Sequence, residues 1–353
     1  MRTIAVVCEY NPFHRGHQYL LEQARARFEG EETRILCLMS GSFVQRGEPA
    51  VFDKYKRARM AIEGGADLVL ELPAPYSCSV AEHFALGAIS IIHRLGVADV
   101  LAFGSEGKKE DALAVIAQRL SSSEFLKMKE ELRQKKRALS YPKLLDLTYA
   151  TLYGEELALS SNEILGVQYL TALNREQSGI CPIALPMLSG VCASDIRKEL
   201  IAQNEKSDLA CLENGKRAIL TYLSVCEKKN RFSENAPYCK TLEELFARVR
   251  TANDTDARLK RELLFLLFGI PEESAKINPS FTVLLGANEK GRGLLCEIEK
   301  KSTIPVLSKL SAGAKTVGEE VMNGYLRRER LYTLFTEEAH KANFLFEKRP
   351  YIQ

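Results

Sequence analysis

Tryptophan is absent from this 353-residue chain, histidine occurs only five times, and no apolar run is long enough to cross a membrane. Because a membrane-spanning helix needs about 18 consecutive apolar residues, such a span is excluded. From Met1 the chain runs directly into an apolar, strand-like segment, without the layout of a signal peptide. We therefore expect a cytoplasmic protein.

Paired cysteines are also missing. The nine cysteines are scattered and none forms a Cys-x-x-Cys pair, so we expect neither a disulfide framework nor a zinc ribbon, and a reducing compartment is the default. The net charge of +3 is too small to indicate a partner by itself, although residues 201–353 carry net +4 and residues 1–200 net −1. That mild basic bias is compatible with a polyanionic partner.

The first two hundred residues alternate short apolar runs with helical patterns. Breaker residues close the runs, such as Pro12 after the first and Pro73 after the third. Short strands joined by helices through short connections are typical of an α/β protein with a doubly wound parallel sheet, and we expect this fold class. The pattern predicts strands at residues 4–8, 33–39, 68–72, 100–103 and 181–186, and helices at 16–30, 54–63 and 79–95.

The length leaves room for about two domains. We expect residues 1–200 to form the sheet domain, with a helical insertion at about 108–160, and residues 201–353 to form a mainly α-helical domain. The insertion carries a basic stretch, whose ordinary interpretation is a solvated helix face. It consists of Lys127, Lys129, Arg133, Lys135, Lys136, Arg137 and Lys143.

The heptapeptide from Asn11 to His17 (NPFHRGH) joins the first predicted strand to the first helix, at the edge where such sheets bind ligands. His14 and His17 share one helix face, and Gly16 between them lets a ligand approach the backbone. The helix N-terminus offers N–H groups to an anion, and each imidazole adds a donor. The motif holds no nucleophile, so it indicates positioning and charge stabilisation, as in phosphoryl or nucleotidyl transfer.

Two other interpretations of the histidine pair stay open. The pair could ligate a metal ion together with His83 or His93. It could also be structural, which is the usual case for a single histidine. The preceding Pro-Phe and the internal glycine favour a nucleotide turn, so we expect no metal held by the protein.

Several sequence blocks along residues 1–200 resemble a known family. The His-x-Gly-His sequence is similar to the signature of nucleotidyltransferases that share an ancestral fold with class I aminoacyl-tRNA synthetases. The further resemblance is to the tRNA(Met) cytidine acetate ligases. It is carried, in order, by residues 39–50 (MSGSFVQRGEPA), Asp53-Lys54, and residues 65–73 (GADLVLELP), 103–106 (FGSE) and 161–169 (SNEILGVQY).

This resemblance implies a Rossmann-like nucleotidyltransferase fold and an RNA-modifying ligase. Members of the family use ATP, as Mg-ATP, and acetate to form acetyl-adenylate with release of diphosphate. They pass the acetyl group to N4 of the wobble cytidine of elongator tRNA(Met) and release AMP. The partners expected for this chain are therefore acetate and elongator tRNA(Met), with no membrane.

The resemblance also implies site residues. His14 and His17 would hold the phosphates and be catalytic together with Arg197. Gly104 would lie under the adenosine and Asn162 would hydrogen-bond ATP, with a plain turn and a helix cap as the alternatives. Ser194-Asp195-Ile196-Arg197 resembles a second phosphate signature, Ser-x-Ile-Arg, in which Arg197 neutralises phosphate oxygens. The residues expected around ATP are Val7, Cys8, Glu9, Tyr10, Asn11, Pro12, Phe13, His14, Arg15, Gly16, His17, Gln18, Tyr19, Leu20, Gly104, Asn162, Ser194 and Arg197.

Polar residues at the mouth of the same site are expected to contact acetate, magnesium or tRNA phosphate, with surface ion pairs as the alternative. They are Ser40, Gly41, Arg46, Asp53, Lys54 and Arg57. The basic stretch and the second half of the chain are candidates for a tRNA surface. Four tyrosines there could stack on bases, although tyrosines on helices usually lie in the core: Tyr222, Tyr238, Tyr325 and Tyr332.

The sequence departs from the family pattern in one connection. Members carry a basic loop with glycine and histidine before the Ser-x-Ile-Arg helix, whereas residues 187–193 here contain no arginine or histidine. Two alternatives therefore stay open. One is a small-molecule nucleotidyltransferase, which would share the fold and the histidine motif, and the other is a degenerate paralogue that binds nucleotide or RNA without catalysis.

Overall fold

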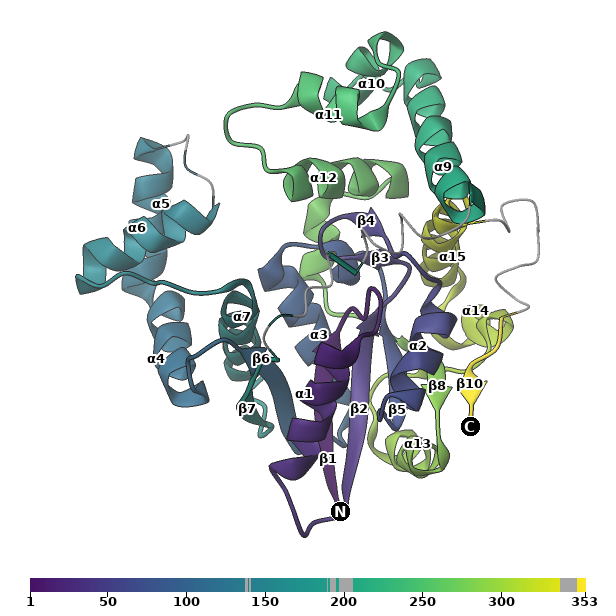
Figure 1. Ribbon diagram of the computed structural model, residues 1–353. Coiled ribbons are helices and arrows are strands. Elements are labelled where there is room, and N and C mark those ends of the chain that lie inside the picture. Colours follow the sequence, from purple (N-terminus) through teal and green to yellow (C-terminus); the bar gives the residue numbers. More distant parts are fainter. Residues whose placement is uncertain (137–138, 140, 189, 191–194, 197–205, 337–347) are drawn as a thin grey trace.

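A mixed eight-stranded sheet forms the centre of the molecule (Figure 1). The computed structural model describes the whole chain except residues 137–138, 140, 189, 191–194, 197–205 and 337–347. The strand order is β10-β8-β5-β2-β1-β6-β7, with β9 beside β8. The bounds are β1 Arg2–Cys8, β2 Thr33–Ser40, β5 Leu68–Leu72, β6 Val100–Ser105, β7 Cys181–Pro186, β8 Thr282–Ala287, β9 Val306–Leu307 and β10 Tyr351–Ile352.

Five neighbouring strands run parallel, so their carboxyl ends share one edge. The connections that leave β1, β2 and β6 at this edge are the polar segments that the sequence singled out. The doubly wound α/β fold is confirmed, with one addition: β8 pairs antiparallel with β5, which makes the sheet mixed. The shared edge is the place where folds of this class bind their ligands.

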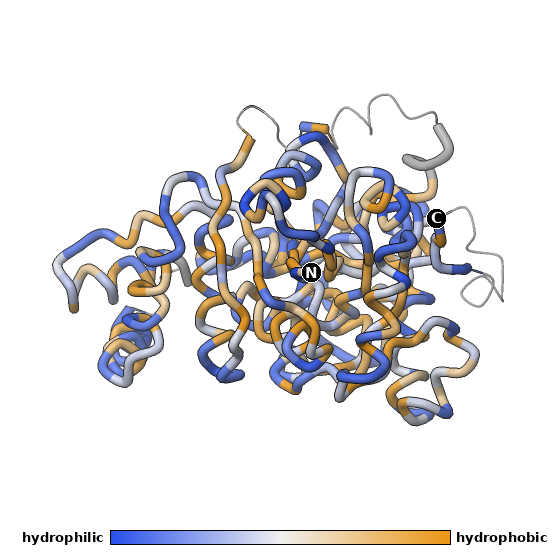
Figure 2. Tube along the Cα trace, turned by 90° about the horizontal axis from the view of Figure 1, so that it is seen from below, coloured by the Kyte–Doolittle hydropathy of each residue, from blue (hydrophilic) through white to orange (hydrophobic). Residues whose placement is uncertain are grey.

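Each central strand contributes to two hydrophobic cores. In β2, Ile35 and Cys37 belong to one core, whereas Leu36 and Leu38 belong to the other. This alternation explains the unbroken apolar runs of the sequence, because a strand covered on both faces has no polar side. In Figure 2, hydrophobic stretches of the chain run through the middle of the molecule. Each fully buried leucine or isoleucine stabilises the fold by about 1.5–3 kcal/mol.

Helices cover both faces of the sheet. One core includes residues of α1 (Arg15–Ala26), α2 (Lys54–Glu63), α14 (Gly313–Val317) and α15 (Glu319–Thr333). The other includes residues of α3 (Ala81–Leu95), α4 (Glu110–Ser121), α7 (Ser161–Arg175) and α13 (Glu289–Lys301). The histidine motif on α1 and His83 on α3 therefore lie on opposite faces.

Two helical groups extend from this layered body (Figure 1). The insertion continues from α4 into α5 (Ser123–Lys135) and α6 (Tyr141–Tyr153). The second group has its own small core. It consists of α9 (Lys206–Val225), α10 (Arg231–Asn235), the 3-10 turn η2 (Ala236–Tyr238), α11 (Leu242–Val249) and α12 (Asp256–Phe268).

A short hairpin connects the second helical group to the sheet edge. The hairpin strands are β3 (Phe43–Val44) and β4 (Glu48–Pro49). Arg261 of α12 donates to the Gln45 carbonyl oxygen at 3.2 Å, and Lys260 forms an ion pair with Glu48. The loop after β2 is thereby held by a helix from the second half of the chain.

The sequence predicted the helices after residue 200 but not the strands there. Segments β8, β9 and β10, with α13, return to the central sheet. The domain boundary near residue 200 stays a prediction of the sequence. The central sheet contains strands that come before this boundary and strands that come after it. Among the described residues, no helix is long and apolar enough to cross a membrane.

Candidate nucleotide-binding site

The loop after β1 is fixed by packing beneath the histidine motif. Tyr10 is buried and adopts a φ of 46°, which turns the chain sharply out of the strand. Its ring lies edge-on to Phe13, with centroids 4.9 Å apart, and 4.8 Å from the ring of His17. Asn11 is also buried, and its Oδ1 accepts from the main chain of Val51 at 2.8 Å. The loop therefore presents the motif from a rigid base.

His14 and His17 form a reciprocal cap at the start of α1. The Nδ1 atom of His14 accepts from the N–H of Gly16 at 3.1 Å, and the Nδ1 atom of His17 accepts from the N–H of His14 at 3.3 Å. The two rings stack with centroids 3.7 Å apart. An imidazole that accepts at Nδ1 carries its proton on Nε2, so each ring can donate from Nε2.

The protonation state of His17 follows from its surroundings. Burial, and next the neighbouring His14, lower the pKa of His17 to about 3. The ring therefore stays neutral at physiological pH. It can donate a hydrogen bond to a phosphate oxygen without taking up a proton first.

The first turn of α1 suits an anion. It contains no acidic side chain, and the helix dipole places partial positive charge at its N–H groups. Gly16 is buried, while Arg15 and Gln18 are exposed beside it. The structure brings together the predicted stretch from the half-buried Val7 and Cys8 at the end of β1 to Tyr19 and Leu20 on α1.

Gly104 lies against a side chain of this protein. A Cβ atom added at Gly104 would lie 2.1 Å from the Sδ atom of Met187, the residue that follows β7. The absence of a side chain at Gly104 therefore leaves room for Met187. Sequence reasoning missed this contact, because Met187 lies far from Gly104 along the chain, just after the neighbouring strand β7.

Two blocks that the sequence singled out meet in the structure. Glu163 on α7 accepts from Ser105 Oγ and from the main-chain N–H groups of Lys108 and Ser160, each at 3.0 Å. Asn162 Nδ2 donates to Glu106 Oε1 at 2.7 Å. The cap of α7 is Ser160, not Asn162. Asn162 is thus held beside the loop after β6, and the contact of Asn162 with ATP stays a prediction.

The second phosphate signature cannot be placed. Ser194 and Arg197 lie outside the described residues, as does part of the 187–193 connection. Their predicted roles stay predictions.

Arg57 is fully buried and joins the ends of β1 and β2. Its guanidinium donates to the carbonyl oxygens of Glu9, at 2.6 Å, and Ser40, at 3.1 Å, and also to those of Gly41 and Phe52. Ser40 and Gly41 are buried as well. These three residues shape the edge, and their predicted contact with substrate stays a prediction.

Lys54 is buried in a charged cluster that sequence reasoning missed. Its Nζ lies 2.9 Å from both carboxylate oxygens of Glu71 and 2.7 Å from Glu329 Oε2. It also contacts the Tyr325 hydroxyl, which donates to Glu71 at 2.8 Å. Although burial alone would lower the pKa of Lys54, Glu329 and Glu71 raise it. Lys54 is therefore a charged anchor inside the protein and not a surface ion pair.

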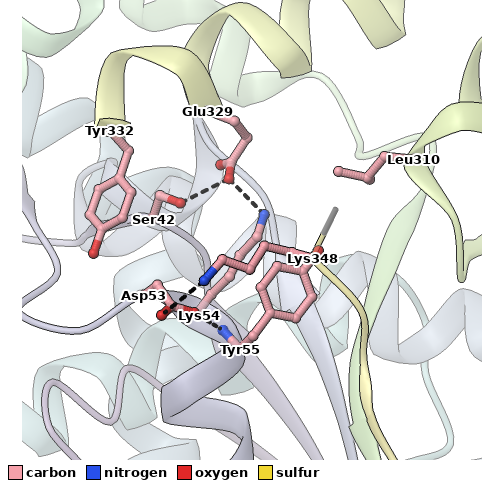
Figure 3. A pocket seen from close by; sticks show the side chains of 8 residues that line it. All are labelled: Ser42, Asp53, Lys54, Tyr55, Leu310, Glu329, Tyr332 and Lys348. Carbon is pink, nitrogen blue, oxygen red and sulfur yellow. Dashed lines mark hydrogen bonds and ion pairs between the residues drawn. The ribbon is translucent and has the colours of Figure 1, made fainter. Parts of the chain in front are cut away.

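Figure 3 shows a small cavity beside this cluster. Its volume of about 20 Å³ is about enough for one water molecule. Asp53 caps α2 through the N–H groups of Tyr55 and Lys56 and lies 3.9 Å from Lys348. Arg46, by contrast, is exposed at the tip of the β3–β4 hairpin. Of the six residues predicted at the mouth, Arg46 is the exposed cation.

The metal interpretation gains no support. Among the described residues, no three His, Cys, Asp or Glu side chains are grouped so as to hold a metal ion. His83 lies on the other face of the sheet from the motif, and His93 Nδ1 lies 3.2 Å from Ser178 Oγ near the opposite end of α3.

A core of five parallel strands whose first helix presents the histidine pair at the strand ends defines a nucleotidyltransferase of the His-x-Gly-His class. A family model described as "HIGH Nucleotidyl Transferase" matches residues 1–187 and 210–345. The similarity to one group within this class extends along nearly the whole chain. The chain belongs to the tRNA(Met) cytidine acetate ligase family.

Curated relatives and a solved structure carry this assignment. The chain is 33% identical to the tRNA(Met) cytidine acetate ligase of Acetivibrio thermocellus, with 94% of each chain covered. It is 31% identical to the Halothermothrix orenii protein of the same name, over 92% of this chain and 90% of that one. The crystal structure of Thermotoga maritima TmcAL bound with alpha-thio ATP has a TM-score of 0.86 and 27% identity, over 100% of this chain and 99% of that one.

Proposed function

We propose that this chain is an ATP-dependent ligase that activates acetate as acetyl-adenylate and acetylates N4 of the wobble cytidine of elongator tRNA(Met). AMP and diphosphate are the by-products, and the reaction belongs in the cytoplasm, with the tRNA. The observation that carries the proposal is the pair of imidazoles at the N-terminus of α1, each with Nδ1 bonded to the main chain and Nε2 left to donate, in a member of this family.

The histidine motif fits a nucleotide polyphosphate. The turn offers two imidazole donors within the positive end of the helix dipole, with no carboxylate in the first turn of α1 to repel an anion. Burial of His17 keeps its ring neutral at all physiological pH values, so its Nε2–H donates while its Nδ1 still accepts from the main chain. These groups would hold the phosphates, and the continuous stretch from Val7 to Leu20 would surround them.

The chemistry needs no nucleophile from the protein. An acetate oxygen forms a bond to the α-phosphorus, the bond from that phosphorus to the bridging oxygen breaks, and diphosphate leaves. The N4 amine then attacks the acetyl carbonyl, loses a proton, and AMP departs. His14 and His17 would stabilise the charge that grows on the departing diphosphate, which is where fixed donors accelerate a reaction most.

A large substrate requires a surface outside the nucleotide pocket. We propose that the helical insertion at about 108–160 and the helices after residue 201 provide it. The insertion supports this because Lys127, Arg133, Lys135 and Lys136 of α5 and its end are exposed. Exposed cations of this kind neutralise backbone phosphates, and binding would weaken as salt rises.

The proposal is tested with purified protein, ATP, acetate and a transcript of elongator tRNA(Met). Wild-type protein should release diphosphate only when acetate is present and should yield N4-acetylcytidine in the tRNA. His17→Ala should lower diphosphate release by about 100- to 1,000-fold, since it removes a charge-stabilising donor. His83→Ala, on the opposite face of the sheet, is the matched control and should retain wild-type rates.

The outcomes separate the three candidate functions. Diphosphate release with another acceptor, and none with acetate, would indicate a small-molecule nucleotidyltransferase. No release under any condition would indicate a degenerate paralogue. Wild-type release by His17→Ala would overturn the role of the motif.

A further inference from the structure

The four tyrosines that the sequence analysis named as candidates for base stacking fall into a buried pair and an exposed pair. Tyr325 and Tyr332 are buried and belong to the core. Tyr222 and Tyr238 are exposed, with 54% and 73% of their surface accessible. The exposed pair lies in the second helical group, Tyr222 on α9 and Tyr238 at the end of η2. Figure 1 shows this end of the group, around α10 and α11, beyond the edge where the parallel strands end.

Tyr238 is held in a defined position by its neighbours. The residue two positions before it, Ala236, is buried and belongs to the core of the helical group. The Arg248 guanidinium lies over the Tyr238 ring, with its Cζ 5.3 Å from the ring centroid. Arg248 Nε also donates to Asn235 Oδ1 at 2.9 Å. One hydrogen bond and one ring contact thus fix a guanidinium against an exposed ring.

Exposed lysines of the same helical group form no ion pair within the described part of the chain. Lys228 and Lys229 are exposed in the turn between α9 and α10, and Lys240 is exposed just after η2. Other basic residues of the group are neutralised, such as Lys216 by Glu213 and Glu243. The Lys228 carbonyl accepts from Asn230 and Ser233, which anchors the turn. We call Tyr238, Arg248, Lys228, Lys229 and Lys240 the arm patch.

An exposed aromatic ring covered by a guanidinium, with unpaired lysines on the same helical group, has the chemistry of a single-stranded nucleic acid site. Unpaired bases stack on aromatic rings and guanidinium planes, and the adjoining phosphates attract lysines. A ring and a guanidinium already held together lose little freedom when a base is added, so the arrangement is preorganised. The Arg248 guanidinium on the ring and the exposed lysines of the same helical group favour RNA over an apolar protein partner.

We propose that the arm patch binds unpaired bases of the tRNA substrate, with Tyr238 as the stacking platform. This inference rests on the proposed function for the identity of the RNA. The patch acts by holding the tRNA and does not touch the reacting atoms, so its loss should affect tRNA affinity and leave ATP binding unchanged.

The test compares Tyr238→Ala with Tyr238→Phe, which keeps the ring. Removing a base-stacking aromatic costs about 1–3 kcal/mol, so Tyr238→Ala should raise the Kd for the tRNA(Met) transcript about 5- to 150-fold. Tyr238→Phe should bind within about twofold of wild type. Because the side chain is exposed, the unfolding midpoint of both variants should equal that of wild type.

Salt dependence distinguishes stacking from charge. Replacing Lys228 and Lys229 with Gln should flatten the plot of log affinity against log salt by about 0.7 per lost phosphate contact, the value for single strands. Tyr238→Ala should weaken binding equally at every salt concentration and keep the slope. A merely structural role of Tyr238 would instead change the slope or the unfolding midpoint, which would overturn the proposal.

The inference and the proposed function fail in different experiments. Unchanged tRNA affinity in Tyr238→Ala would overturn the arm patch, even if wild-type protein acetylates tRNA. Such a result would favour the alternative, in which the exposed ring contacts a protein partner. Absence of acetate-dependent diphosphate release in wild-type protein would overturn the proposed function, while a loss of RNA affinity in Tyr238→Ala would still support the patch as an RNA site.

Discussion

At the scale of a single residue, His17 shows how packing selects a protonation state. Its Nδ1 accepts a main-chain hydrogen bond, and its ring stacks on His14. A second proton would remove that acceptor and place a charge inside a stack of rings. Neutrality is therefore part of the local structure, and the ring remains a donor over the whole physiological pH range.

The first prediction concerns the titration of His17. In nucleotide-free protein, NMR should show the His17 ring neutral at pH 6.5, its ordinary pKa, with protonation only near pH 3. Between these values the unfolded chain binds a proton that the folded chain does not, so stability should fall as pH falls. His17→Gln should show a shallower loss over that window. A His17 midpoint close to 6.5 would contradict the prediction.

Single residues also show what sequence reasoning can and cannot reach. The histidine pair was predictable because three-residue spacing after a strand is a local pattern. The partners of Lys54 were not, since Glu71 and Glu329 come from distant elements. One signal was present: Glu71 interrupts the apolar run from Leu68 to Leu72, and a charge inside a buried strand requires a buried partner.

At the scale of elements, α7 is coupled to the loop after β6 by one carboxylate. Glu163 closes the cap of α7 on Ser160 and also accepts from the loop at Ser105 and Lys108. Two blocks that lie far apart in the sequence thus form one unit beside Gly104. The helix cap that Glu163 forms with Ser160 was predictable from local sequence. The hydrogen bonds of Glu163 to the loop after β6, which clamp that loop to α7, depend on the packing of β6 against α7.

The second prediction is the cost of neutralising this clamp. Glu163→Gln replaces an acceptor with an amide and should destabilise the protein by about 1–3 kcal/mol in urea unfolding at pH 7. Burial raises the pKa of Glu163, but hydrogen bonds from Ser160, Lys108 and Ser105 outweigh it, and the pKa lies below 4.5. The difference from wild type should therefore persist above pH 4.5 and disappear as pH falls through the folded-state value.

The matched control for the clamp is Glu156→Gln, since Glu156 is exposed shortly before α7. That variant should remain within about 0.5 kcal/mol of wild type. Equal effects of the two substitutions would contradict the role of Glu163.

Element prediction failed at β8 for a physical reason. The six residues of β8, TVLLGA, are all buried, and a short apolar run has the same appearance in a buried strand and in a buried helix. The β-branched pair Thr282-Val283 and the preceding Pro279 favoured a strand. The antiparallel pairing with β5 had no local signal, because it joins segments from opposite halves of the chain.

At the scale of the whole molecule, the buried charge cluster joins the beginning of the chain to its end. Lys54 starts α2 and Glu71 belongs to β5, whereas Tyr325 and Glu329 belong to α15. Ser42, in the loop after β2, donates to Glu329 at 2.8 Å. The loops at the binding edge therefore depend on a helix from the last part of the sequence. Disruption of the cluster should lower the free energy of unfolding of the whole fold.

The last prediction removes the central cation. Lys54→Met leaves Glu71 and Glu329 buried without their counter-ion, and breaking such a cluster costs about 3–5 kcal/mol in the free energy of unfolding. Lys300→Met, at an exposed position of α13, should stay within about 0.5 kcal/mol of wild type. Adding Glu71→Gln and Glu329→Gln to Lys54→Met should restore more than half of the loss, because no buried charge is then uncompensated. A triple variant less stable than Lys54→Met would show that the hydrogen bonds, and not the charges, hold α15 to the sheet edge.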